Sequence, residues 1–289
     1  MKIVRLSHEN NETYGFVKGD KVATKDEITY LTGVPIPLNV KDFLFDGWYD
    51  EIKNKIKDLP YEENISKYKL LTPIPNPNKI ICLAFNYRDH AKEQEMKAPE
   101  DPVIVMKPRT ALTSTNSEII CPNFVTKLDY EVELAVIIGK NCKNLSLEDA
   151  SGAVFGYMVF NDVSARDIQF KDKQFTRGKS FDSFAPCGPW ITTADEIQDA
   201  QNLKLTTKIN GEIRQNSSTN QMYIKIYEIV SKISKVMTLE KGDIIATGTP
   251  SGVALNNPNI DFLKDGDKVE MEIEGLGILN NTIKFVESD

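Results

Sequence analysis

The chain has 289 residues, 40% of them hydrophobic and 9% aromatic, enough to bury a substantial core in one large domain with or without a small appendage. Its net charge is -7 and its basic residues are scattered singly among acids, which excludes a nucleic-acid-binding face and favours a small-molecule partner. Because no long apolar run and no secretory signal are present, we expect no membrane span and a cytoplasmic protein. Four cysteines without C-x-x-C spacing favour reduced thiols over disulfides or a zinc site: Cys82, Cys121, Cys142 and Cys187.

Residues 1–72 have the pattern of a small α+β domain. Gly19 and Asp20 separate two apolar runs, which predicts a hairpin, and residues 40–59 place apolar and charged residues at helical spacing until Pro60. Alternate prolines in 72–78 then favour extended backbone and exclude helix. We therefore predict two domains, a small one at 1–72 and a large one at 73–289.

Short β-rich runs dominate the large domain. Residues 268–275 alternate strictly between apolar and acidic, the pattern of a strand with one wet face, and residues 223–237 have helical spacing. The other predicted strands are 79–85, 103–107, 132–139, 156–160, 189–193, 203–211 and 243–248. Many strands with few helices indicate an α+β fold whose mixed β-sheet is rolled or barrel-like.

Two glutamates interrupt an otherwise apolar strand in the stretch LDYEVELAV. Alternate strand residues share a face, so the Cα atoms of Glu131 and Glu133 would lie about 6.6 Å apart. Unpaired burial of both would cost several kcal/mol, so water, a base or a divalent cation has to compensate. Asp162 at the end of the next strand adds a third carboxylate, and this oxygen-only set predicts a Mg²⁺ site that Mn²⁺ or Ca²⁺ could also occupy. A solvated strand face remains the alternative for the glutamate pair.

His90 follows a buried strand, and Glu93 lies three residues further on, so on a helix the two side chains share a face. A carboxylate there would orient the imidazole for general-base chemistry on water, although a solvated polar helix has the same pattern. Residues 91–100 carry almost no apolar stripe, so we expect them to order over a bound ligand as a lid.

Lys179 follows a polar loop at 171–178 and precedes two phenylalanines, which suggests an ammonium beside an apolar wall where it could stabilise an oxyanion. An ordinary surface lysine fits the composition as well. The run ATGTPSG at 246–252 places small residues at a strand end, where backbone N–H groups could cradle a carboxylate. A plain tight turn accounts for that run equally.

Together these motifs resemble the fumarylacetoacetate hydrolase family over about residues 79–285. The matching segments are FNYRDHAKE, LDYEVELAVIIGK, NDVSARDIQ, GKSFDSFAPCGPW and GDIIATGTPSGV, in that order. The resemblance implies a β-roll catalytic domain, a homodimer, Mg²⁺ on Glu131, Glu133 and Asp162, and a water-activating dyad of His90 and Glu93. It also implies an oxyanion role for Lys179 and substrate-binding roles for Arg166, Gln169 and Thr249.

From this resemblance we predict a Mg²⁺-dependent hydrolase that cleaves a C–C bond in 2,4-dioxo acids of the acylpyruvate or fumarylacetoacetate kind. Within the same family, a decarboxylase or isomerase of the oxaloacetate or 2-hydroxyhepta-2,4-diene-1,7-dioate type is the alternative. A catalytically inactive metal-binding or dimerisation protein is a third possibility. We expect the lid and the loop 171–178 to decide the acyl length and charge of the keto acid.

Overall fold

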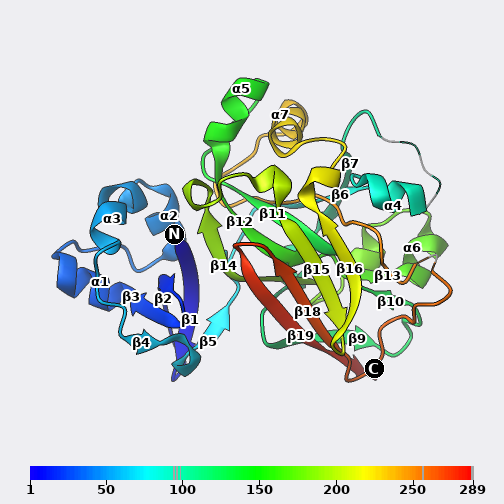
Figure 1. Cartoon of the computed structure of the whole chain (residues 1–289), viewed down its shortest axis with the longest axis horizontal. Coiled ribbons are helices and arrows are strands. Elements are labelled where there is room, and N and C mark those ends of the chain that lie inside the picture. The colour runs from blue at the N-terminus through cyan, green and yellow to red at the C-terminus, as the bar shows by residue number, and fades with distance from the viewer. Residues whose placement is uncertain (94, 96, 98, 256, 288–289) are drawn as a thin grey trace.

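The computed structural model describes residues 1–93, 95, 97, 99–255 and 257–287. Residues 94, 96 and 98 of the predicted lid lie outside this description. Two large mixed sheets pack against each other, and helices lie around their edges (Figure 1). Within the described residues, no helix combines the length and the hydrophobicity that a membrane crossing requires.

The larger sheet has 12 strands in the order β4-β3-β2-β1-β14-β12-β11-β17-β6-β7, with β5 beside β1 and β8 beside β14. β11 pairs antiparallel with both β12 and β17, and β17 pairs parallel with β6, so this sheet is mixed. The strands from the large domain are β6 (Ile80–Ala84), β7 (Val103–Lys107), β8 (Leu112–Ser114), β11 (Val132–Ile138), β12 (Val154–Asn161), β14 (Ala185–Thr193) and β17 (Ile244–Ala246).

The N-terminal part extends this sheet, because β1 pairs antiparallel with β14. Its strands are β1 (Lys2–His8), β2 (Asn11–Lys18), β3 (Lys21–Thr24), β4 (Glu63–Asn64) and β5 (Lys69–Leu71), and its helices are α1 (Lys25–Thr32), α2 (Val40–Phe45) and α3 (Trp48–Ile56). Thr24 and Glu27 form a capping box that fixes the start of α1. The predicted hairpin at Gly19 is confirmed as β2–β3.

The smaller sheet has five strands in the order β16-β15-β18-β19-β9. Its strands are β9 (Ser117–Pro122), β15 (Lys204–Ile209), β16 (Glu212–Ser218), β18 (Lys268–Ile273) and β19 (Gly277–Val286), and a two-stranded sheet joins β10 (Leu128–Asp129) to β13 (Ser164–Ala165). The other α-helices are α4 (Arg88–Glu93), α5 (Leu147–Ala150), α6 (Arg166–Asp172) and α7 (Ile226–Val236).

β11 is buried on both faces, and each face belongs to a different core. Val132, Leu134 and Val136 pack in the core between the two sheets, whereas Ala135 and Ile137 pack in a core shared with the N-terminal helices. Burial on both faces explains why the strand is almost continuously apolar. Glu133 is therefore a polar side chain in a strand with no wet face, and it needs a specific partner.

The predicted α+β class with mixed sheets is confirmed, and the described strands form open sheets rather than a closed barrel. The prediction of one helix over 40–59 is wrong, because the segment forms two helices, α2 and α3. They are separated at Gly47, whose φ of 90° interrupts the helix. All four cysteines are buried and unpaired, as expected for structural thiols. The division at residue 72 stays a prediction.

Candidate active site

Three carboxylates meet where β11 begins and β12 ends. Glu131 lies immediately before β11, Glu133 is the second residue of β11, and Asp162 follows the last residue of β12. Because Val132 pairs with Asn161, the start of one strand lies beside the end of the other. One ligand atom from each of the three acids lies within 4.8 Å of the other two. The strand pattern therefore gathers the predicted metal ligands at one point.

Lys179 lies among these carboxylates. Its Nζ donates to Glu131 Oε2 at 2.8 Å, to Asp162 Oδ2 at 2.7 Å and to Ser164 Oγ at 2.9 Å, so all three of its N–H donors are used. Burial opposes the charge on Lys179, but the carboxylates of Asp162 and Glu131 outweigh it and raise its pKa. Lys179 is thus a charged, fully hydrogen-bonded ammonium, not the alternative surface lysine.

Two further cationic side chains pair with the carboxylate oxygens of Glu131 and Asp162 that Lys179 does not contact. Lys107 Nζ donates to Asp162 Oδ1 at 2.5 Å and to the Val163 carbonyl at 3.1 Å. Arg166 donates to Glu131 Oε1 at 2.7 Å and to Asp129 Oδ2 at 2.9 Å. Glu131 and Asp162 are therefore paired through both of their oxygens.

The two glutamates have opposite electrostatic surroundings. Burial works to raise the pKa of Glu131, but Lys179 and Arg166 outweigh it and lower that pKa to about 2. For Glu133, burial and then the charges of Asp162 and Glu131 raise the pKa well above its ordinary value. Glu133 Oε2 accepts from the Gly248 N–H at 2.7 Å, and Oε1 is buried without a hydrogen-bond partner among the described residues.

This arrangement fits a hard divalent cation. The three acids offer only oxygen ligands, the type that Mg²⁺, Mn²⁺ and Ca²⁺ prefer. The buried Oε1 of Glu133 is an acceptor in need of a positive partner. The run 246–252 supplies the N–H that cradles Glu133, so its predicted contact with a carboxylate is present within the protein itself.

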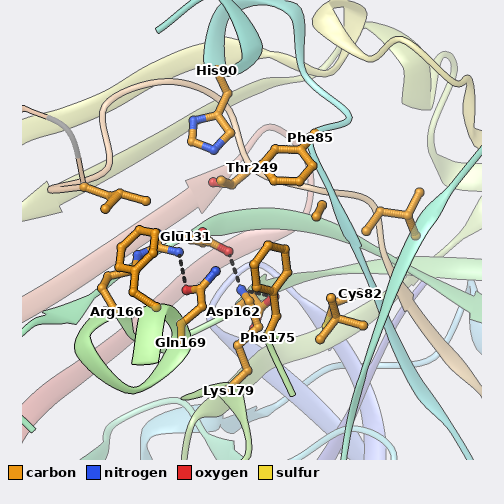
Figure 2. Close-up of a pocket in the computed structure, with 15 residues that line it drawn as sticks. Cys82, Phe85, His90, Glu131, Asp162, Arg166, Gln169, Phe175, Lys179 and Thr249 are labelled. Atoms are coloured by element: carbon orange, nitrogen blue, oxygen red, sulfur yellow. Dashed lines mark hydrogen bonds and ion pairs between the residues drawn. The ribbon is translucent and has the colours of Figure 1, made fainter. Parts of the chain in front are cut away.

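His90 and Glu93 lie on α4, as predicted. His90 is 5% exposed, and its Nδ1 is 3.4 Å from Glu93 Oε2, which also accepts from the Gly252 N–H at 3.4 Å. Figure 2 shows the imidazole pointing from α4 towards the cavity, with Lys179 and Asp162 on the opposite side. The His90–Glu93 contact predicted from helical spacing is present.

A cavity of about 160 Å³ connects these groups. Within the described residues, the predicted site residues all line it except Glu93 and Glu133. Its polar wall consists of Glu131, Asp162, Arg166, Gln169 and Lys179, and its aromatic wall consists of Phe85, Phe170 and Phe175. Gln169 Oε1 accepts from Arg166 at 3.2 Å, which turns the amide nitrogen towards the cavity (Figure 2).

Thr249 is held by a residue that sequence reasoning missed. The buried Gln215 donates to Thr249 Oγ1 at 2.9 Å and to the Pro250 carbonyl at 3.0 Å. Its Oε1 accepts from the Val132 N–H at 3.1 Å and from Thr207 Oγ1 at 2.9 Å. Gln215 thereby joins the loop that carries Thr249 to the residue between the two glutamates.

Lys107 and Asp129 were also missed. Asp129 precedes Glu131 by two residues, so the same alternation that selected the glutamates could have found it. Lys107 is a lone charge at the end of an apolar strand, which is only a weak signal. Nothing local marks Gln215, because its four partners come from other elements.

Comparisons with known proteins agree with this geometry. Residues 79–284 match the family model described as fumarylacetoacetate (FAA) hydrolase C-terminal. An oxaloacetate tautomerase from Bacillus subtilis is 46% identical over 224 residues, covering 76% of this chain and 74% of the relative. A mitochondrial oxaloacetate tautomerase from Bos taurus is 43% identical over 220 residues, covering 75% and 70%.

Solved structures share the fold over the whole chain. A 5-carboxymethyl-2-hydroxymuconate delta-isomerase from Mycobacterium smegmatis has a TM-score of 0.79 at 33% identity and covers 100% of both chains. A maleylpyruvate hydrolase from Sphingobium sp. SYK-6, in complex with manganese(II) and pyruvate, has a TM-score of 0.81 at 31% identity and covers 99% of this chain and 100% of its own. These relatives are enzymes that act on small molecules. The chain described here belongs to the fumarylacetoacetate hydrolase family.

Proposed function

We propose that the protein is a divalent-cation-dependent isomerase that interconverts the keto and enol forms of a short 2-oxo acid of the oxaloacetate class. The observation that carries this proposal is the cavity of about 160 Å³, in which an acidic cation site, Arg166, Gln169 and His90 converge. Oxaloacetate tautomerases at 43% and 46% identity support the choice of reaction.

Glu131, Glu133 and Asp162 would hold the cation, which we propose to be Mg²⁺, with Mn²⁺ or Ca²⁺ as substitutes. When bound, such a cation supplies Lewis acidity that polarises the oxo and carboxylate oxygens of the substrate. Lys107, Lys179 and Arg166 hold two of the three carboxylates in position through paired contacts. These contacts keep the ligand oxygens in one orientation before substrate arrives.

The proton transfer falls to His90 in this proposal. Keto-to-enol conversion breaks a C–H bond beside the oxo group and forms an O–H bond on the oxo oxygen. The side chain that transfers the proton must face the substrate. The His90 imidazole points into the cavity (Figure 2), and its Nδ1 contacts Glu93. The amide of Gln169 and the remaining N–H groups of Arg166 would bind the distal carboxylate.

Hydrolytic C–C cleavage of a 2,4-dioxo acid is the second candidate, and the His90–Glu93 contact favours it because an oriented imidazole can deprotonate water. In that reaction Lys179 would stabilise the oxyanion. It would have to exchange one of its three present hydrogen bonds for the substrate oxygen. A decarboxylase of oxaloacetate would use the same cation without His90.

One experiment separates these reactions. The full-length protein is incubated with Mg²⁺ or with EDTA and given oxaloacetate, an acylpyruvate, fumarylpyruvate or 2-hydroxyhepta-2,4-diene-1,7-dioate, while enol absorbance and products are followed. We expect Mg²⁺-dependent equilibration of enol and keto oxaloacetate without new carbon products. Release of a carboxylic acid would instead establish the hydrolase, and release of CO₂ with pyruvate the decarboxylase. No reaction and no Mg²⁺-dependent thermal shift would point to the non-catalytic alternative.

We also propose a homodimer, on family resemblance alone. Size-exclusion chromatography with light scattering tests it. A mass near the 32.6 kDa of one chain would contradict the dimer.

A further inference from the structure

Two of the three rings of the aromatic wall come from loops, and the third, Phe170, lies on α6. Phe85 lies between β6 and α4, and Phe175 lies in the loop after α6. Their ring centroids are 6.0 Å apart with an interplanar angle of 70°, the edge-to-face arrangement that aromatic pairs prefer. Both rings line the cavity that contains the acidic site (Figure 2). The pair therefore joins two segments that are distant in sequence at one side of the site.

Phe85 keeps its position against a backbone cost. Its φ is 61°, a left-handed conformation that bulky residues rarely adopt and that costs on the order of 1–3 kcal/mol. The next residue fixes it, because the Asn86 side chain donates to the carbonyls of Thr247 at 2.9 Å and Ile224 at 3.2 Å and accepts from the Ile224 N–H at 2.9 Å. The ring is thus held at the cavity by a strained but well-bonded turn.

Because the cavity is small, the two rings limit the space for a substrate chain. A cavity of about 160 Å³ is on the scale of one that takes benzene. In the view of Figure 2, Arg166 and Gln169 lie on one side of the carboxylates, and Phe85 and Phe175 lie on the other. A 2-oxo acid with a single carboxylate has no distal carboxylate for Arg166 to bind, so with its head at the acidic triad its apolar chain would extend towards these two rings.

We propose that Phe85 and Phe175 set the upper chain length of the 2-oxo acid that this site accepts. The pair admits a short acid and excludes one with a long apolar chain. This inference rests on the proposed function, because it needs the oxo-acid head to bind at the acidic triad. It assigns the length limit to two side chains, only one of which lies in the loop 171–178.

The test measures binding, which does not depend on the reaction. Full-length protein with Mg²⁺ is titrated calorimetrically with pyruvate, 2-oxopentanoate and 2-oxooctanoate. For the wild type, we expect affinity to fall at least about ten-fold from pyruvate to 2-oxooctanoate. In Phe175→Ala, 2-oxooctanoate should tighten by at least about ten-fold while pyruvate changes by less than about three-fold.

Two variants and one control sharpen this test. Phe85→Gly also removes a ring and suits the positive φ, so it should relax the length limit without an added backbone penalty. Phe175→Trp should weaken 2-oxopentanoate. Phe124→Ala breaks a pair with Phe181 whose centroids are also 6.0 Å apart, but outside the cavity, and should leave all three affinities unchanged.

The outcomes separate the two proposals. If the wild type binds pyruvate and 2-oxooctanoate equally, or if neither Phe175→Ala nor Phe85→Gly alters their ratio, the length limit is overturned and the oxo-acid function stands. If none of the acids binds in the presence of Mg²⁺, the proposed function falls and the length limit falls with it. Melting curves of each variant verify that the folded protein is being compared.

Discussion

The polar and aromatic walls of the cavity are held by different interactions. On the polar wall, Lys179 has three hydrogen-bond partners and Glu131 is paired through both oxygens, so moving one side chain disturbs several others. On the aromatic wall, Phe85 and Phe175 touch through their ring faces and edges, and Phe170 is 56% exposed. Under the proposed function, catalysis would depend on a tightly coupled network, whereas the choice of substrate would depend on a wall that can be changed one ring at a time.

The largest effect should follow from breaking the network behind the polar wall. Lys107→Met leaves Asp162 Oδ1 without its cation, and because the Lys107 side chain is 0% exposed, we expect the free energy of unfolding to fall by about 3–5 kcal/mol. Lys208→Met is the matched control, since its 2.7 Å pair with Glu270 lies at the surface and should cost less than about 1 kcal/mol. Equal losses in urea denaturation would mean that the buried network is no more coupled than a surface pair.

Glu133→Gln should separate cation binding from folding. The variant keeps the shape of Glu133 but loses a charged ligand, so we expect cation-dependent turnover to fall by more than about 100-fold. Without Mg²⁺ the free energy of unfolding should not fall, because Glu133 Oε1 has no partner within the described residues to lose. Glu272→Gln, at an exposed position of β18, should behave as the wild type in both measurements.

Removal of the cation tests the same wall without mutation. At a Mg²⁺ concentration a hundred times the dissociation constant, binding to the folded state should add about 2.7 kcal/mol to the free energy of unfolding, and EDTA should abolish this gain. Thermal melts of wild type and Glu133→Gln, with and without Mg²⁺, measure it. A gain of the same size in both proteins would place the cation elsewhere.

Gln215→Glu should have a smaller effect. A carboxylate cannot donate to Thr249 Oγ1 or to the Pro250 carbonyl, and leaving such buried acceptors unpaired costs about 1–3 kcal/mol. Asn216→Asp, at the exposed neighbouring position on β16, is the control and should be near neutral. If the two variants unfold at the same urea concentration, Gln215 does not hold the Thr249 loop.

The smallest effect is expected on the aromatic wall. Phe170→Ala removes a ring that is already 56% exposed, so the free energy of unfolding should change by less than about 0.5 kcal/mol. Urea denaturation alongside Lys107→Met gives the direct comparison. A loss of several kcal/mol for Phe170→Ala would remove the distinction between the two walls.

Local rules indicated the acidic triad and the His90–Glu93 contact, but they left a solvated strand face and a solvated helix as alternatives. Strand alternation places Glu131 and Glu133 on one face, a strand end delivers Asp162, and helical spacing joins His90 to Glu93. Lys107 and Gln215 were missed because Asp162 lies 55 positions from Lys107 and Val132 lies 83 positions from Gln215, so that only the folded chain brings these pairs together. A single helix was predicted over 40–59 because the apolar periodicity continues through Gly47, although the backbone changes direction there.

The pairing of β1 with β14 has a practical consequence for anyone who trims this protein to its family-matching segment. A fragment that starts at residue 79 would lack β1, which pairs with part of β14, a strand that is buried apart from the partly exposed Trp190. It would also expose the apolar side chains that Phe16, Ile28 and Phe43 cover. Bare strand edges beside exposed hydrophobic surface recruit other chains, so such a fragment should precipitate or associate nonspecifically. Expression vectors for crystallography or assay should therefore retain the leading segment.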